Sequence, residues 1–257
     1  MLMIETTVVE YREITTESPV IIVGLPGIGL VGKLVADHLI IELKAEKFME
    51  IFSPHLPPQV NVNPDGTIKL VSNELYFYKG NEKTPDIIIL VGDHQSVTNE
   101  GHYELAGIYL DIAEKFKARR VYTLGGYGTG KMIEQPHVLY ATNKPDLIEE
   151  IKSYGAIFNE GELSGGIIGA SGLMLGLGEL RGMECVCFMG ETSGYLVDPK
   201  SAQAVMGVLC KALNLEIDTS ELEARAQEIE KIITKIKEME QSQLPQKESS
   251  TQENYFG

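Results

Sequence analysis

Apolar runs rich in β-branched residues alternate along the chain with segments of helical periodicity. Four runs have the continuous apolar character of strands covered on both faces. They are PVIIVGLP at 19–26, DIIILVGD at 86–93, RRVYTLGG at 119–126 and MECVCFMG at 183–190. Helical patterns follow at 28–42, 99–117 and 200–213. The alternation predicts an α/β fold, a three-layer α/β/α sandwich whose mixed sheet is mostly parallel.

A short pair of alternating segments interrupts this pattern. QVNVN at 59–63 and TIKLV at 67–71 place apolar residues at every second position and flank NPDG, a sequence typical of a turn. We expect a β-hairpin that extends or decorates the main sheet.

The composition changes near residue 214. We divide the chain into an α/β/α domain at 1–213, an amphipathic helix at 214–241 and a flexible tail at 242–257. A heptad-like seam runs along the helix and consists of Leu222, Ala226, Ile229, Ile233 and Ile236. A seam this short is stable when it is buried, either on its own domain or across subunits. We therefore expect the helix to contact a partner.

Charge narrows the classes of partner. The chain has 37 Asp and Glu residues against 22 Lys and Arg residues, a net charge of −15, which repels nucleic acids and anionic membranes. Three cysteines form no closed disulfide set, and acidic residues near the N-terminus are unlike a secretory signal. The most apolar stretch, 165–178, is shorter than the ~18 residues of a membrane span. We expect a cytoplasmic protein that binds neither nucleic acid nor a membrane.

The segment GLPGIGLVGK at 24–33 follows a strand and opens a helix, a position where free backbone amides favour anions. Gly27, Gly29 and Gly32 fit the dinucleotide pattern G-x-G-x-x-G. Gly27 to Lys33 also fits G-x-x-x-x-G-K, but Leu34 stands where a P-loop needs Ser or Thr to bind magnesium. The competing interpretation is structural, because glycines also permit a tight turn and close packing of a helix on a sheet.

Two further loops follow predicted strands. The loop at 92–104 contains Asp93 and His94, together with Glu100, His102 and Glu104, which could ligate a metal or act as acid and base. Their spacing matches no metal motif, so capping and loop-fixing hydrogen bonds are the alternative. The loop at 125–136 has four glycines and Lys131, typical either of a ligand loop or of plain turns.

No complete catalytic constellation is present in the sequence. Cys185 and Cys187 alternate along one strand, which predicts buried thiols on one face of the sheet. Ser171 lies among glycines without the G-x-S-x-G pattern of a nucleophile elbow. We expect no catalytic residue, no metal and no cofactor.

Taken together, four segments resemble the archaeal PAC2 family, which is similar to eukaryotic proteasome assembly chaperones. They are GLPGIGLVGKLVADHLI, IILVGDHQS, RRVYTLGGYGTG and GGIIGASGLMLGLGELRGMECVCFMGET. The resemblance covers about 18–213. It implies a phosphorylase/hydrolase-like fold without an established enzymatic activity, homo-oligomers, and assistance to the assembly of proteasome α-subunits.

The resemblance also directs attention to the C-terminus. Family members that dock on the proteasome end in a hydrophobic residue, a tyrosine and any residue, whereas this chain ends Tyr255-Phe256-Gly257. The phenylalanine occupies the tyrosine position without its hydroxyl. Either this shifted tail contacts the partner, or ENYFG is a remnant of a protease-cleavage site.

Two functions follow. The first is a non-catalytic, oligomeric assembly chaperone or protein-binding scaffold that contacts proteasome α-subunits or another family member through its C-terminal helix and tail. The alternative is a nucleoside- or nucleotide-binding enzyme that uses the loops at 24–33, 92–104 and 125–136.

Overall fold

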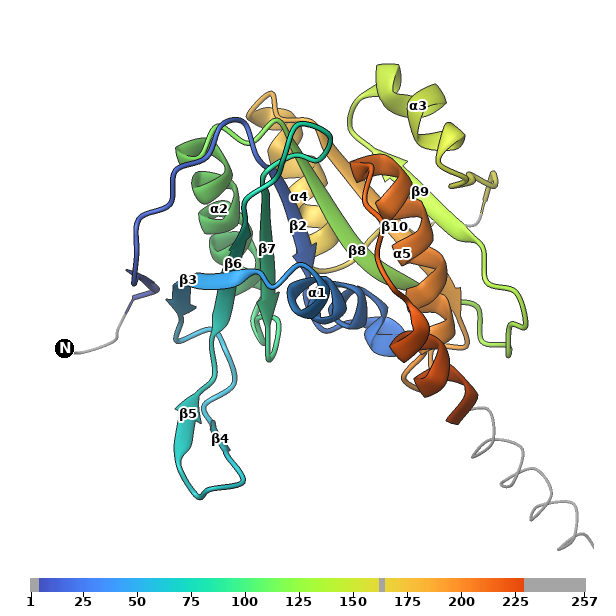
Figure 1. Ribbon diagram of the computed structural model, residues 1–257. Coiled ribbons are helices and arrows are strands. Elements are labelled where there is room, and N and C mark those ends of the chain that lie inside the picture. The colour runs from blue at the N-terminus through green and yellow to red at the C-terminus, as the bar shows by residue number, and fades with distance from the viewer. Residues whose placement is uncertain (1–4, 162–164, 229–257) are drawn as a thin grey trace, which may run out of the picture.

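The structure, a computed structural model that describes residues 5–161 and 165–228, has an eight-stranded sheet between two layers of helices (Figure 1). The strands of this sheet are β1 (Thr7–Glu10), β2 (Val20–Gly24), β3 (Glu46–Phe52), β6 (Asn73–Tyr78), β7 (Ile87–Gly92), β8 (Arg120–Gly128), β9 (Val138–Thr142) and β10 (Cys185–Thr192). The helices are α1 (Val31–Glu42), α2 (Asn99–Lys115), α3 (Ile148–Ser153), α4 (Ala170–Leu180) and α5 (Pro199–Leu213).

The strand order β1-β3-β6-β7-β2-β8-β10-β9 corrects one expectation. The three central pairs, from β7 to β10, are parallel, whereas the other four pairs are antiparallel. The sheet is therefore mixed rather than mostly parallel. The continuous apolar runs predicted the buried central strands correctly. The flanking strands β1, β3, β6 and β9 carry more polar or partly exposed positions and were not predicted.

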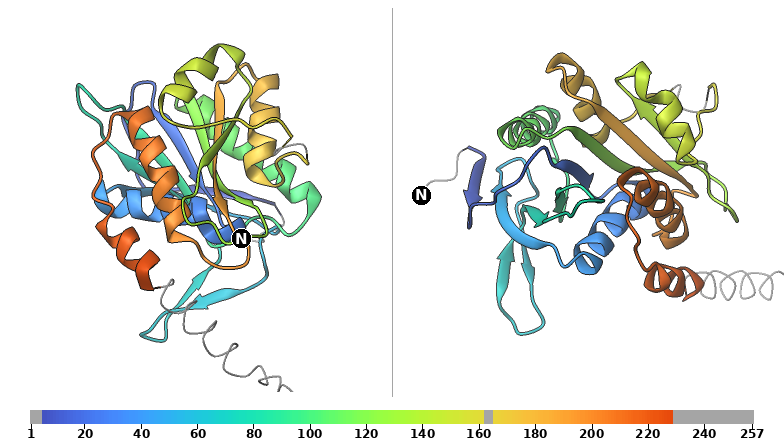
Figure 2. Two further views of the ribbon diagram at one scale, coloured as in Figure 1. Left: turned by 90° about the vertical axis from the view of Figure 1, so that its right-hand side faces the viewer. Right: turned by 45° about the horizontal axis from the view of Figure 1, so that its top comes forward.

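Side chains of the central strands contribute to two hydrophobic cores, one on each face of the sheet. Along β2, Ile22 packs towards α1 and α5, whereas its neighbours Ile21 and Val23 pack towards α2 and α4. All five residues of β2 are buried. Because successive side chains of a strand point to opposite faces, only a run that is apolar at every position suits such a strand. The predicted three-layer arrangement is confirmed, and Figure 2 shows it from two further directions.

Polar caps set the starts of two predicted helices. The Thr98 side chain accepts a hydrogen bond from the Gly101 backbone at 3.0 Å and opens α2. The Asp198 carboxylate accepts one from the Ser201 backbone at 2.9 Å and opens α5. Each cap satisfies a backbone N–H that the first helical turn leaves without an internal partner. Among the described helices, none is both long and apolar enough to cross a bilayer.

The predicted hairpin is present but stands apart from the main sheet. It consists of β4 (Val60–Val62) and β5 (Ile68–Leu70), which pair only with each other in a two-stranded sheet. Figures 1 and 2 show it projecting from the end of the sheet at which the central parallel strands finish. The hairpin therefore decorates the sheet and does not extend it.

The described part of the C-terminal helix begins at residue 220 and packs on its own domain. Leu222 is 1% exposed and belongs to the core on the α1 side of the sheet. Just before it, the Asp218 carbonyl oxygen lies 2.6 Å from His38 Nε2 of α1. Six predicted contact residues lie outside the described residues, namely Ile229, Ile233, Ile236, Tyr255, Phe256 and Gly257.

Candidate functional site

A pocket of about 580 Å³ lies at the carboxyl ends of the central parallel strands; we call it the edge pocket. Strands β7 and β8 lie on either side of β2, which makes this the switch point where open α/β sheets bind ligands. All three predicted loops contribute to it. The lining includes Gly27 and Ile28 from the first loop, Gln95 and His102 from the second, and Tyr127 and Gly128 from the third.

Gln95 holds two walls of the edge pocket together. Its side-chain nitrogen donates to the Pro26 carbonyl at 2.7 Å, and its side-chain oxygen accepts from the Ala170 backbone at 3.1 Å. Both ends of the amide are thus used to join the loop after β2 to the start of α4. A Cβ at Gly169 would lie 2.7 Å from the Gln95 oxygen, and φ there is +85°. Glycine is required at this position for both reasons.

The described lining of the edge pocket carries no Asp, Glu, Lys or Arg. Its polar side chains are those of Gln95, Ser96, His102, Tyr127 and Ser171. At its rim, Ile28 is 51% exposed and Ile168 is 92% exposed. Such a surface suits an apolar, uncharged occupant better than a phosphate group.

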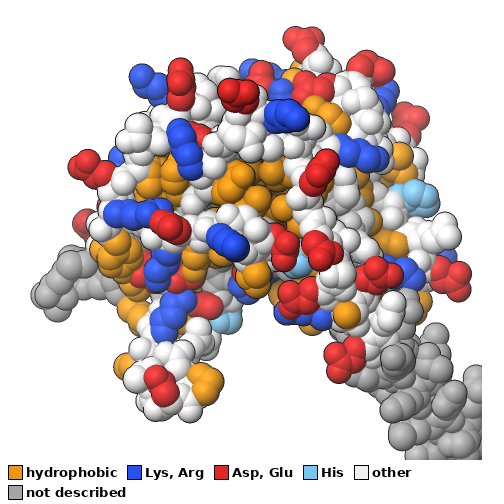
Figure 3. Space-filling view, viewed as in Figure 1, with side chains coloured by type: hydrophobic (Ala, Val, Ile, Leu, Met, Phe, Trp, Pro, Cys, Tyr) orange, Lys and Arg blue, Asp and Glu red, His pale blue; other side chains and the backbone are white. Residues whose placement is uncertain are grey.

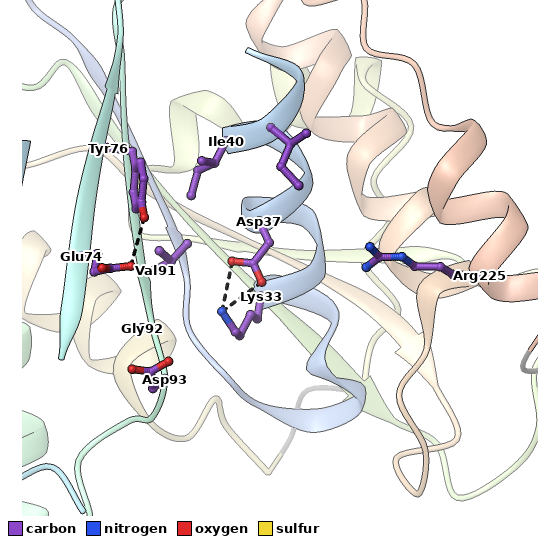
Figure 4. Close-up of a pocket in the computed structure, with 10 residues that line it drawn as sticks. Lys33, Asp37, Ile40, Glu74, Tyr76, Val91, Gly92, Asp93 and Arg225 are labelled. Carbon is purple, nitrogen blue, oxygen red and sulfur yellow. Dashed lines mark hydrogen bonds and ion pairs between the residues drawn. The ribbon is translucent and has the colours of Figure 1, made fainter. Parts of the chain in front are cut away.

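A second hollow, of about 350 Å³, lies between α1 and the ends of β6 and β7; we call it the charged pocket (Figure 4). Lys33 lines it, but the lysine Nζ lies 3.0 and 2.9 Å from the two carboxylate oxygens of Asp37. Glu74 and Asp93 face the same hollow, and Arg225 approaches from the C-terminal helix. The two lining cations are both paired with carboxylates, and Arg225 uses Glu221 of its own helix, which is unfavourable for a nucleotide phosphate.

Glu74 is the electrostatic centre of the charged pocket. Lys47 Nζ lies 3.0 Å and Lys69 Nζ 3.1 Å from its Oε1, and the Tyr76 hydroxyl donates to Oε2 at 3.1 Å. Burial raises the pKa of Glu74, but hydrogen bonds and charge from the two lysines outweigh it and hold the pKa at about 2. Burial and the Glu74 charge together raise the pKa of Tyr76 to about 12. Both pKa shifts therefore arise from burial and from contacts among the protein's own side chains.

The glycines of the first loop are used for close packing. A Cβ at Gly32 would lie 2.3 Å from the Leu124 carbonyl oxygen on β8. Gly29 has a φ of +63°, and a Cβ there would lie 2.9 Å from the Thr192 hydroxyl. Of the three predicted glycines, Gly27 alone lines the edge pocket. The observed contacts support the structural interpretation of this motif.

Of the remaining predicted ligand residues, Asp93 shares the charged pocket with Lys33, whereas His94 and Lys131 line neither pocket. His94 Nε2 lies 2.8 Å from the Gln59 side-chain nitrogen, whereas Asp93 Oδ2 faces Lys69 Nζ at 3.8 Å. Lys131 lies in an exposed loop, and its backbone donates to the Thr129 hydroxyl at 3.3 Å. Within the described residues there is no group of three or more His, Cys, Asp or Glu side chains placed to hold a metal ion.

The paired cysteines behave as the sequence predicts. Both Cys185 and Cys187 are fully buried and belong to the core on the α2 and α4 side. Burial raises the pKa of the thiols to about 11 and about 12, respectively. They are small core side chains with little thiolate character.

Sequence reasoning missed several residues of the edge pocket. Gln95 lies within a motif that was identified, but nothing in its type distinguished it from its neighbours. Ile167, Ile168 and Met189 belong to apolar runs that also fit core positions. Their part in the pocket depends on how α4 and β10 pack, which a local pattern does not contain.

The chain is similar in sequence and in structure to known proteins. The model of the PAC2 family matches residues 21–237. An uncharacterised protein of Methanocaldococcus jannaschii is 45% identical over 228 residues, which cover 89% of this chain and 86% of that protein.

Two solved structures of Pyrococcus furiosus proteins are also similar. One is PbaB, described as an archaeal proteasome activator, with 44% identity, a TM-score of 0.87 and coverage of 91% of this chain and 99% of that one. The other is PbaA, described as an archaeal homologue of proteasome-assembly chaperone. It has 27% identity, a TM-score of 0.76 and coverage of 93% and 94%.

Proposed function

Because this chain belongs to the PAC2 family, we propose that it is a non-catalytic protein that acts on the proteasome as an activator or assembly chaperone. The observation that carries the proposal is its similarity to PbaB over almost the full length of both chains. PbaB is described as a proteasome activator, and its identity to this chain is higher than that of PbaA. Activation is therefore the more strongly supported of the two roles.

The packing of the predicted site residues supports a binding role rather than catalysis. Gly32 packs against the backbone of β8, Gly29 packs against the Thr192 side chain, and Lys33 is paired with Asp37. The described lining of the edge pocket has His102 and two serines but no carboxylate, and that of the charged pocket has carboxylates but no Ser, Cys or His. We propose that the protein recognises other proteins as a homo-oligomer that presents several copies of one contact, which strengthens weak binding.

Contact with the partner is proposed to run through the C-terminal helix and tail. Leu222 is buried on its own domain and anchors the start of the helix. The seam positions further along, Ile229, Ile233 and Ile236, are apolar in the sequence and suit a partner surface. The terminal Tyr255 and Phe256 add aromatic side chains, which are enriched in interface hot spots.

A binding measurement tests this proposal. The full chain and a variant that ends at residue 241 are each mixed with purified archaeal proteasome α-subunit rings, and complexes are measured by sedimentation. We expect the full chain to co-sediment with the rings and the shortened chain to bind at least tenfold more weakly. The variant Gln246→Ala, which changes the tail but keeps its aromatic end, serves as the control. Absence of any complex with the full chain would refute the proposal.

The competing proposal is a nucleoside- or nucleotide-binding enzyme of phosphorylase/hydrolase-like fold. The meeting of three predicted loops in the edge pocket favours it, whereas the uncharged lining speaks against phosphate. Thermal unfolding with nucleosides, nucleotides, phosphate and divalent metals distinguishes the two. A ligand at a hundred times its dissociation constant adds ~2.7 kcal/mol to stability, which raises Tm measurably. We expect no shift; a clear shift with a nucleoside would favour the enzyme.

A further inference from the structure

The β4–β5 hairpin carries an apolar face that is exposed in this chain. Val60 pairs with Leu70 and Val62 with Ile68, so four aliphatic side chains share one face. Their exposed fractions range from 42% to 71%. Hydrophobic side chains are visible on the projection at the lower left of Figure 3. A two-stranded hairpin is marginally stable in water, and a continuous exposed apolar face marks an interaction site.

The opposite face of the hairpin is attached to the domain. Asn61 and Lys69 form a cross-strand pair on that face. Lys69 Nζ lies 3.1 Å from a Glu74 oxygen and 3.8 Å from an Asp93 oxygen at the base of the hairpin. These ion pairs hold the polar face to its own chain and leave the aliphatic face free for a partner.

We propose that this aliphatic face inserts into the edge pocket of a second copy of the chain. The inference concerns how copies meet and stands whether or not the proteasome is the partner. Both surfaces lie at the carboxyl end of the central strands: β5 leads into β6, whose first residue Asn73 pairs with Gly92 at the end of β7. The edge pocket is lined by the residues that follow β2 and β7 and by the end of β8.

Charge favours a second copy as the occupant. A chain with a net charge of −15 repels itself wherever acidic surfaces meet. The hairpin, residues 60–70, contains one acid, Asp65, and one base, Lys69, so its net charge is zero. The described lining of the edge pocket contains neither acids nor bases of the Asp, Glu, Lys or Arg type. The two surfaces therefore meet without bringing like charges together.

Size favours insertion over contact between two hairpins. Four partly exposed aliphatic side chains offer a few hundred Å², whereas a stable interface buries about 800 Å² on each partner. If the hairpin enters the pocket of about 580 Å³, the pocket lining and the exposed rim residues Ile28 and Ile168 are buried as well, so the contact area is larger. The contact joins two different surfaces, so one copy supplies the hairpin and the other supplies the pocket.

Two full-length variants and their mixture test this contact by light scattering. Val62→Glu places a charge on the apolar face of the hairpin, and Ile168→Glu places one on the pocket rim. Asn61→Glu, on the polar face of the same strand, and Leu180→Glu, 83% exposed at the far end of α4, are the controls with matched charge. Unfolding midpoints establish that all four variants are folded.

We expect the unchanged chain to be oligomeric, both site variants to have the mass of one chain, and both controls to keep the unchanged mass. An equimolar mixture of Val62→Glu and Ile168→Glu should then form a species of two chains, because one retains a working pocket and the other a working hairpin. A monomeric unchanged chain, or an oligomeric site variant, would overturn the proposal. Failure of the mixture to form the two-chain species would overturn it as well.

Discussion

Gly32 shows how a single residue without a side chain can set the distance between a helix and a sheet. It lies in the first turn of α1, and a Cβ there would meet the Leu124 carbonyl oxygen at 2.3 Å. We expect Gly32→Ala to lower the free energy of unfolding by about 1 to 3 kcal/mol, because backbone must move to relieve the contact. Denaturant unfolding measures the change.

Gly207→Ala is the matched control for this substitution. Gly207 lies within α5, and a Cβ there meets no atom within 4 Å. Alanine in an open helical position stabilises by about 0.5 to 1 kcal/mol. Equal effects of the two substitutions would show that Gly32 is not a site of close packing.

The Glu74 carboxylate makes stability depend on pH in the acid range. Its folded pKa of about 2 lies below the ordinary value of 4.5, so its contribution is complete above pH 4.5 and is lost as pH falls towards 2. We expect Glu74→Gln to lower the free energy of unfolding at pH 7 by about 1 to 3 kcal/mol, with the difference from the unchanged chain disappearing near pH 2.

The control for the pH series is Glu149→Gln. This carboxylate is 86% exposed and pairs with Lys152 on the surface, so its removal should change stability by less than about 1 kcal/mol. Urea unfolding between pH 2 and pH 7 gives both curves. A Glu74→Gln difference that stays constant over this range would contradict the assigned charge network.

Sequence could predict residue types at the site but not their partners. Gly27 and Lys33 were found through two phosphate-binding patterns, and the structure shows that they face different pockets. The ion pair between Lys33 and Asp37 is an i, i+4 contact that the sequence alone could suggest. The sequence could not show that Glu74 and Asp93 line the same pocket and make it unfavourable for an anionic ligand. Glu74 lies on β6 and Asp93 directly after β7, both distant in the sequence from Lys33.

At the scale of elements, the start of the C-terminal helix is bound to its own domain. We expect Leu222→Ala to lower the free energy of unfolding by about 2 to 5 kcal/mol, because the leucine is 1% exposed in the core. Glu223→Ala, an exposed neighbour, should be close to neutral. Thermal or denaturant unfolding of the full-length variants measures both changes in stability. If both substitutions are neutral, the helix does not pack on the domain as described.

The elements that sequence predicted are those with a strong local signal. The central strands are apolar at every position, and the helices that follow them carry caps such as Thr98 and Asp198. By contrast, β3 and β6 contain charged residues, and Glu50 of β3 lies opposite Glu74 of β6. Lys47, also on β3, forms ion pairs with both carboxylates and offsets their repulsion. Such compensation depends on strand pairing, so the antiparallel half of the sheet was not predicted.

At the scale of the whole molecule, charge and surface apolarity have complementary roles. A net charge of −15 repels other copies of the chain, and the hairpin and the edge pocket are uncharged surfaces at which the proposed contact would avoid that repulsion. Assembly through them would present several C-terminal helices on one particle. A particle of this kind suits a symmetric partner, because repeated weak contacts add to a strong one.

Peptide hydrolysis by a purified archaeal proteasome core particle tests the central claim most directly. Adding the full chain should raise the rate at which a fluorogenic peptide is cleaved at least severalfold, in a concentration-dependent manner and without ATP being hydrolysed. The chain ending at residue 241 should have no such effect at the same concentration. An unchanged rate with the full chain, under conditions in which it binds the particle, would contradict the account of this protein as an activator.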